Sequence, residues 1–129
     1  MDADTLKSIP LFAELSDEAL RALALTVREL SVSEGTHIVD EGNYSYDFSI
    51  IEDGTAQVIR GDDVIAELGP GDFFGEVGLL EKEQRNASVV ATSRVRLLTL
   101  TAWDLRRLGQ RMPDVVEKIR GAAAERSDA

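Results

Sequence analysis

Apolar residues near the start of the chain recur at the spacing of an α-helix. The stripe contains residues three or four positions apart, which share one side of a helix: Leu20, Leu23, Val27 and Leu30. Ser16 precedes this stripe and can accept a hydrogen bond from an unpaired amide of the first turn. Asp17 and Glu18 then occupy that turn, where the helix dipole favours negative charge. The pattern predicts an N-terminal helical segment over residues 1–30.

From residue 31 to about residue 100, short apolar runs alternate with turns rich in Gly, Asp and Pro. The runs cover residues 48–51, 57–60, 64–68, 87–91 and 95–100. Many short strands separated by such turns are typical of an antiparallel roll or barrel. We therefore predict an antiparallel β-roll, of the double-stranded β-helix or jelly-roll type, over residues 31–100.

Helical spacing returns after residue 100. Thr101 and Asp104 have the spacing of a capping box, and the residues expected on the buried edge of this helix are Leu105, Leu108 and Met112. Pro113 interrupts the helix because it has no amide hydrogen, and a second helix is expected to bury Val115, Val116 and Ile119. Trp103 is predicted to pack in the core or against a helix. The whole chain, 1–129, is predicted to be one α+β domain: a β-roll with an N-terminal helix and two C-terminal helices over 101–126.

The composition excludes several classes of function. Acidic residues outnumber Lys and Arg by 24 to 14, and the resulting charge of −10 repels nucleic acid and anionic lipid. The chain has no cysteine, which excludes disulfides, thiolate metal sites and thiol catalysis. His37, its single histidine, cannot supply a site that needs several imidazoles. No signal peptide and no apolar run of about 18 residues is visible. We therefore expect a cytoplasmic protein that binds no metal, membrane or nucleic acid.

One segment, residues 69–89, departs from the strand pattern and carries candidate chemistry. Gly75 precedes a short apolar stretch, residues 77–80, and Gly78 lies within it; both glycines would let an anion approach the backbone amides of a helix start closely. Arg85 can hold phosphate oxygens in charge-assisted hydrogen bonds. Ionised Glu76 only accepts hydrogen bonds, so it suits a neutral hydroxyl rather than a phosphate. Together these residues fit a ribose phosphate; taken singly, each is an ordinary turn glycine or a solvated charge.

The same segment resembles the phosphate-binding cassette of the cyclic-nucleotide-binding domain family, which is found in catabolite activator proteins, protein kinase A regulatory subunits and cyclic-nucleotide-gated channels. That cassette reads Phe-Gly-Glu-apolar-small-Leu-Leu, a short loop, and Arg-x-Ala-Ser/Thr-Val. This chain has Phe74 to Leu80, then Arg85 to Val89, within a cassette over 71–89. The resemblance extends over essentially the whole chain, at Leu11, Phe12, Leu15, Ser16, Glu41, Gly42, Phe48, Ile50, Ile51, Gly54, Gly69 and Gly71.

The resemblance implies a role for each matching residue. Glu76 would accept from the ribose 2′-hydroxyl, and Arg85 would pair with the cyclic phosphate. The neighbouring cassette residues would line the phosphate, mainly through backbone amides: Gly75, Val77, Gly78, Asn86 and Ala87. Three further residues match positions that line the base pocket in similar domains: Val58, Ala66 and Leu68. Arg126 falls where similar channel domains place a lid arginine over the purine, although a solvated charge is the alternative interpretation.

The chain also departs from the family pattern. Ser45-Tyr46 replaces the usual Gly-Asp, and Gln84 replaces a proline that often precedes the cassette arginine. Asn86 stands where cGMP-selective members often carry a threonine, which favours cAMP and leaves cGMP open. The expected function is a non-enzymatic sensor whose C-terminal helix transmits occupancy by cAMP or cGMP to a protein effector. That helix is also a candidate homodimer surface. The alternative is a degenerate fold that serves as a protein-interaction scaffold without ligand.

Overall fold

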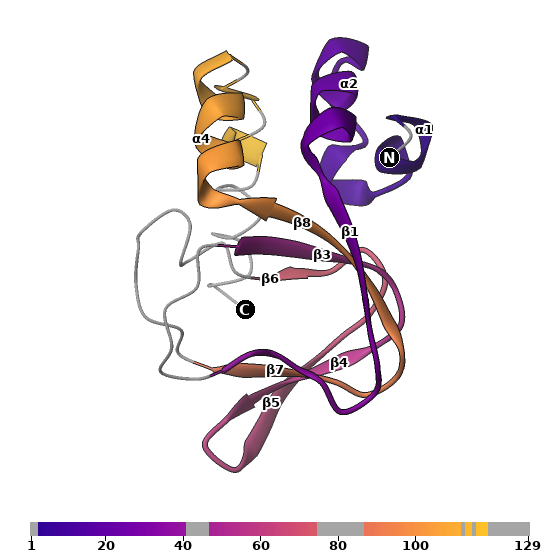
Figure 1. The fold of residues 1–129 in the computed structure, drawn as a ribbon, viewed down its shortest axis with the longest axis vertical. Helices are drawn as coiled ribbons and strands as arrows, with labels where there is room; N and C mark the ends of the chain where they lie inside the picture. Colours follow the sequence, from indigo (N-terminus) through magenta and orange to yellow (C-terminus); the bar gives the residue numbers. More distant parts are fainter. Residues whose placement is uncertain (1–2, 41–46, 75–86, 112, 115, 119–129) are drawn as a thin grey trace.

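Two four-stranded antiparallel sheets form a roll, and helices cover one side of it (Figure 1). The computed structural model describes residues 3–40, 47–74, 87–111, 113–114 and 116–118. Strand order is β1-β8-β3-β6 in the first sheet and β2-β7-β4-β5 in the second. The strands are β1 (Arg28–Val32), β2 (His37–Val39), β3 (Asp47–Asp53), β4 (Ala56–Arg60), β5 (Asp63–Leu68), β6 (Phe73–Phe74), β7 (Ser88–Ala91) and β8 (Val95–Thr101). The predicted antiparallel roll is confirmed.

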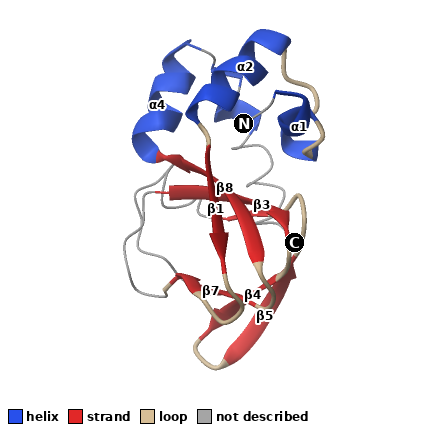
Figure 2. Ribbon diagram, turned by 45° about the vertical axis from the view of Figure 1, so that its right-hand side comes forward, coloured by secondary structure: helices blue, strands red, loops and turns tan. Residues whose placement is uncertain are grey.

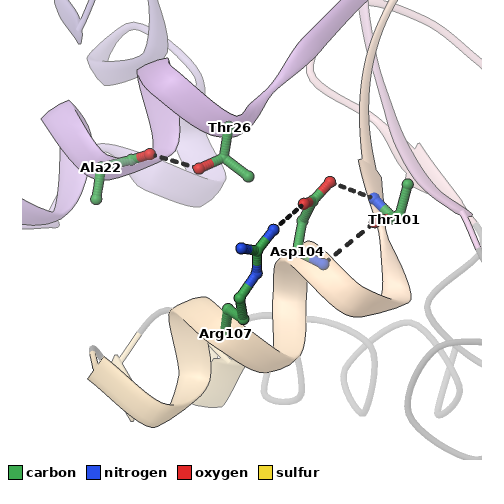
Figure 3. Close-up of polar contacts among 5 residues, drawn as sticks. All are labelled: Ala22, Thr26, Thr101, Asp104 and Arg107. Carbon is green, nitrogen blue, oxygen red and sulfur yellow. Dashed lines mark hydrogen bonds and ion pairs between the residues drawn. The ribbon is translucent and has the colours of Figure 1, made fainter.

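Two of the described helices begin where the sequence places their capping residues. The described helices are α1 (Ala3–Lys7), the 3-10 turn η1 (Pro10–Phe12), α2 (Asp17–Thr26) and α4 (Ala102–Arg111). Ser16 Oγ accepts from Ala19 N at 3.2 Å and so caps α2. At the start of α4, Thr101 N donates to Asp104 Oδ2 at 3.3 Å, and Asp104 N donates to Thr101 Oγ1 at 3.1 Å (Figure 3). Both predicted caps are confirmed.

Leu30 does not belong to the N-terminal helix, contrary to the prediction. Val27 already has an extended backbone, with φ −65° and ψ 136°, so α2 ends at Thr26. Leu30 lies in β1, pairs with Leu97 of β8 and is 50% exposed. The spacing of apolar residues alone would continue the helix through Leu30. Pairing with β8 instead satisfies the backbone hydrogen bonds of this segment, so it forms a strand.

Trp103 is largely exposed, so the prediction that it packs in the core or against a helix is wrong. Leu108, which is 6% exposed, marks the buried side of α4. Trp103 precedes it by five positions, which places it about 140° away around the helix. Its side chain is accordingly 72% exposed. Beyond α4, residues 113–114 and 116–118 are helical, and Val116 packs against the core. The predicted burial of Leu105, Met112, Val115 and Ile119 concerns side chains outside the described part.

The first sheet separates two hydrophobic clusters. Ile50, Leu98 and Phe73 face the helices, whereas their chain neighbours Ile51, Leu97 and Phe74 face the interior of the roll. Figures 1 and 2 both show α2 and α4 on one side of the pair β3 and β8, with β4, β5 and β7 on the other. Because side chains alternate along a strand, consecutive apolar residues serve both clusters. This double burial anchors the strands that lead into the cassette.

Candidate functional site

The chain enters the cassette from a strand that is anchored on both faces. In β6, Phe73 pairs with Ile50 and Phe74 pairs with Ser49. The Phe73 ring lies 5.6 Å from the Phe48 ring, measured between centroids, in the helix-facing cluster. Phe74 packs in the roll interior. The start of the cassette is therefore held by both cores.

A glycine turn precedes β6, as the sequence predicts. Gly71 has φ +91°, in the left-handed region that glycine adopts readily. Gly71 N donates to Ile51 O, and Ile51 N donates to Asp72 O, both at 2.8 Å. The Asp72 carboxylate in turn accepts from Gly69 N at 2.8 Å. These bonds tie the turn to β3 and fix the direction in which the chain enters the cassette.

The chain leaves the cassette in the other sheet. Ala87 is buried, and β7 then pairs with β4, with Ser88 opposite Ile59 and Val89 opposite Val58. Because β6 belongs to the first sheet and β7 to the second, the cassette joins the two sheets.

The predicted phosphate and ribose contacts fall on residues that the structure does not describe. These residues are Gly75, Glu76, Val77, Gly78, Arg85 and Asn86. The lid candidate Arg126 also lies outside the described residues. Ala87 is the cassette site residue that is described. The roles of the others stay predictions.

The three residues predicted to line the base pocket share one face of the second sheet. Val58 pairs with Ala66, and Leu68 pairs with Ala56, two residues before Val58. Directly paired antiparallel residues, and residues two apart on a strand, point to the same side. Val58 and Leu68 pack against the cluster inside the roll, and Ala66 is exposed. This apolar interior face therefore becomes accessible to solvent toward β5.

Sequence reasoning missed Val89 as a member of this wall. Val89 pairs with Val58 from the other side, so Val89, Val58 and Ala66 form one row across three strands. Val39 of β2 continues this row beyond Val89, which is 5% exposed, whereas Ala66 at the β5 edge is open to solvent. The motif includes this valine, but only the strand register shows that it lies beside Val58.

Among the described residues, no three His, Cys, Asp or Glu side chains lie close enough to hold a metal ion. The described helices include none that is long and apolar enough to cross a membrane.

Comparison with known families agrees with this geometry. The family model of the cyclic nucleotide-binding domain matches residues 29–112, which include most of both sheets, the cassette and α4. The chain belongs to the cyclic nucleotide-binding domain family. The match covers about two thirds of its length, and the fold is that of a cyclic nucleotide-binding regulatory domain.

Relatives of this cyclic nucleotide-binding domain occur in channels and kinase regulators. A cyclic nucleotide-gated potassium channel of Rhizobium etli is 35% identical over 92% of this chain and 33% of the channel. A cAMP-dependent protein kinase regulatory subunit of Eremothecium gossypii is 36% identical over 97% of this chain and 27% of the subunit. The chain thus spans about a third or less of the curated relatives it matches.

Solved structures show the same fold. The regulatory domain of Toxoplasma gondii protein kinase A, crystallised with cAMP, aligns with a TM-score of 0.84 and 26% identity, over 95% of this chain and 48% of that one. The catabolite activator protein of Thermus thermophilus aligns with a TM-score of 0.82 and 30% identity, over 92% of this chain and 58% of that one. The cyclic nucleotide-binding domain described here therefore resembles both a kinase regulatory domain and a catabolite activator protein.

Proposed function

We propose that this domain binds a cyclic mononucleotide, with cAMP preferred over cGMP, and that it catalyses no reaction. The main observation behind this proposal is the apolar wall formed by Val58, Ala66 and Leu68. This wall lies in the sheet to which one end of the cassette leads, and the other end of the cassette is held in the first sheet. Such a wall suits the flat apolar faces of a purine. The Toxoplasma gondii relative with cAMP supports the choice of ligand.

The charge of the chain limits how the ligand is held. A net charge of −10 repels a phosphate at long range. A local grip by Arg85 and backbone amides overcomes this repulsion, because exposed charges are screened beyond a Debye length of about 8 Å at physiological salt. Glu76 accepts from the ribose 2′-hydroxyl and distinguishes ribose from deoxyribose.

Binding of the nucleotide is communicated to other molecules through the C-terminal helices. Val116 packs against the helix-facing cluster, and its Cγ2 lies 2.8 Å from the position that a Cβ on Gly109 would occupy. A ligand that favours one packing of this region shifts its population by the difference in affinity for the two states. The receiver of the signal is a protein effector, a second copy of the domain or another part of a longer chain.

Calorimetric titration with cAMP, cGMP and non-cyclic 5′-AMP tests the proposed binding. We expect heat for the two cyclic nucleotides, tighter binding of cAMP, and little or none for 5′-AMP. A ligand that binds only the folded state adds about 2.7 kcal/mol of stability at a hundredfold excess over Kd, so thermal melting gives a second readout. A melting curve that stays flat through millimolar concentrations of both nucleotides would instead support a ligand-free scaffold.

A further inference from the structure

Strand β5 forms one end of the second sheet and leaves an edge open. Among the strands that the structure describes, β5 pairs only with β4, and Figures 1 and 2 both show this pair at the end of the domain opposite the helices. Backbone N–H and C=O groups along such an edge can form hydrogen bonds to another extended chain. We propose that the outer edge of β5 binds an extended basic segment of a partner protein, which adds a strand to this sheet.

β5 is the longest of the four strands that end a sheet. It has six residues, whereas β1 has five, β2 has three and β6 has two. Two neighbouring β-branched side chains on it are accessible to solvent, with Val64 52% and Ile65 46% exposed. Native proteins often protect an open edge with lysine or proline, and β5 contains neither. The edge therefore offers both backbone groups and apolar side chains to an incoming strand.

A β-bulge divides the ladder between β4 and β5. Val58 pairs with Ala66, and the next pair is Ile59 with Val64. Ile65 is therefore the extra residue on β5. A bulge increases the local twist of an edge and limits the length over which another strand can pair with it. We therefore expect a short added segment that places an apolar side chain beside Ile65.

The charges beside this edge are mostly acidic. Asp62, Asp63 and Glu67 are exposed. Arg60 is the one basic residue of β4 and β5, and it lies opposite Asp63 in the ladder. The whole chain carries a charge of −10, so its long-range field acts in the same direction as these local charges. Lysine or arginine on an incoming strand would be attracted by both.

The same charges oppose pairing of β5 with a second copy of itself. An antiparallel pair centred on Ile65 would place Asp63 of each copy opposite Glu67 of the other, and like charges in that position destabilise a sheet. An acidic segment of another protein would meet the same repulsion. A basic segment with alternating apolar residues satisfies the open backbone groups, the exposed apolar side chains and the charge. This docking does not require the nucleotide proposed above.

Amide hydrogen exchange measured by NMR tests the proposed strand addition. The probe is a short peptide in which Lys and Val alternate, with both ends blocked. The amides of β5 that point away from β4 should exchange quickly in the free chain. With peptide at about ten times its Kd they should exchange about tenfold more slowly, because only about a tenth of the edge is then free. Amides of β1, the edge strand of the first sheet, should not change.

Two altered peptides are the controls for this measurement. A peptide with Glu in place of Lys tests the charge, and one with Pro at its centre tests the strand conformation, because Pro lacks an amide hydrogen. Neither should protect β5. Absence of protection by the Lys peptide, or equal protection of β1, would overturn the proposal. Slow exchange of all β5 amides before any peptide is added would show that the edge is already covered, with the same consequence.

Titration of a fluorescently labelled peptide with variants separates local charge from the charge of the whole chain. Asp62→Asn with Glu67→Gln removes two charges beside the edge, and Glu18→Gln with Glu34→Gln removes two exposed charges elsewhere. We expect the first pair to weaken binding about fivefold, from two exposed ion pairs, and the second pair by less than about twofold. Equal losses would mean that net charge alone attracts the peptide, and would rule out the proposed site.

The apolar contact has its own matched variants. Ile65→Thr keeps a β-branched side chain and should weaken peptide binding about threefold, from lost apolar burial. Leu30→Thr changes an exposed apolar residue of β1 and should leave the affinity unchanged; the same loss in both would contradict the proposal. Sedimentation equilibrium of the free chain tests the competing occupant. A dimer that Ile65→Thr dissociates would assign this edge to a second copy and overturn docking of a basic segment.

Discussion

The Nζ atom of Lys118 lies 2.6 Å from Oε2 of Glu14, so residues 104 positions apart are joined across the helical side of the domain. The hydrogen bond from Lys118, followed by its positive charge, lowers the pKa of Glu14 below its ordinary value of 4.5. A carboxyl with a lowered pKa contributes stability above its unfolded pKa and loses that contribution as the pH falls through the folded value. We expect Glu14→Gln to lower the melting temperature slightly near neutral pH.

The same variant should match the unmodified protein in acid, below the pKa of Glu14, because the carboxyl is then neutral in both. High salt should also reduce the difference, since Glu14 is exposed. Glu34→Gln, which alters an exposed glutamate in the turn after β1, is the control. A melting difference for Glu14→Gln that is the same at all pH values would show that the ion pair does not stabilise the fold.

The reciprocal bonds between Thr101 and Asp104 lead to a second prediction. Thr101→Ala should lower the free energy of unfolding by about 0.5–2 kcal/mol, because an amide of the first turn of α4 loses its acceptor. Thr101→Ser keeps the oxygen and should lose much less. Because the two side chains act as one unit, Thr101→Ala with Asp104→Ala should lose less than the sum of the single changes. Chemical denaturation measures the unmodified protein, Thr101→Ser, the two single alanine variants and the double variant; strict additivity would contradict the capping box.

Gly54 is the position where a side chain is least tolerated among the described glycines. Its φ is +96°, and a Cβ there would lie 2.2 Å from the carbonyl oxygen of Arg94. Gly54→Ala should therefore lower the free energy of unfolding by more than the ~1–2 kcal/mol of left-handed strain alone. Gly35→Ala is the matched control, because Gly35 has φ +88° and open space around the same position. Equal losses in the two variants would show that the turn moves to relieve the contact.

Arg85→Ala tests the proposed phosphate contact. A hydrogen bond to a charged group contributes about 1.5–3 kcal/mol, so we expect a loss of roughly ten- to a hundredfold in affinity for cAMP by calorimetry. Arg94→Ala, in the turn between β7 and β8, should bind as the unmodified protein does. Unchanged affinity in Arg85→Ala would remove this residue from the proposed site.

Glu76→Ala tests the ribose contact by the choice of ligand. If Glu76 accepts from the 2′-hydroxyl, the variant should lose affinity for cAMP and lose little for 2′-deoxy-cAMP, which has no such donor. Calorimetry with both ligands measures the two losses. Equal losses would assign Glu76 to another role in the cassette.

Features determined by neighbouring residues were the most predictable from sequence. Ser16 and Thr101 cap their helices through hydrogen bonds to residues three positions away. The longer strands follow from short apolar runs that alternate with turn residues. The strands that were missed are short or mostly exposed: β2 has three residues, β6 has two, and the first four residues of β1 are exposed. Their hydrogen bonds come from distant partners, which a local pattern does not contain.

In the candidate site, too, local motifs were predictable from the sequence and contacts between distant strands were not. The cassette was recognisable because Glu76 and Arg85 stand in one short segment with a characteristic order. The wall beside it depends on strand register, so Val89 was found only when β7 was seen against β4. Trp103 was misplaced for a related reason, because the face that α4 buries depends on where α2 lies.

The two faces of β3, β6 and β8 have a consequence for signal transmission. Phe74 faces the compartment that would receive a nucleotide, and Phe73 faces the helices, with one peptide bond between them. Ile51 and Ile50, and Leu97 and Leu98, repeat this arrangement on the neighbouring strands. A side chain that moves inside the roll displaces its own backbone. The Cα atom of the next residue is about 3.8 Å away, and the side chain of that residue contacts the helical layer. One residue along each of these strands therefore separates the proposed nucleotide compartment from the helical layer.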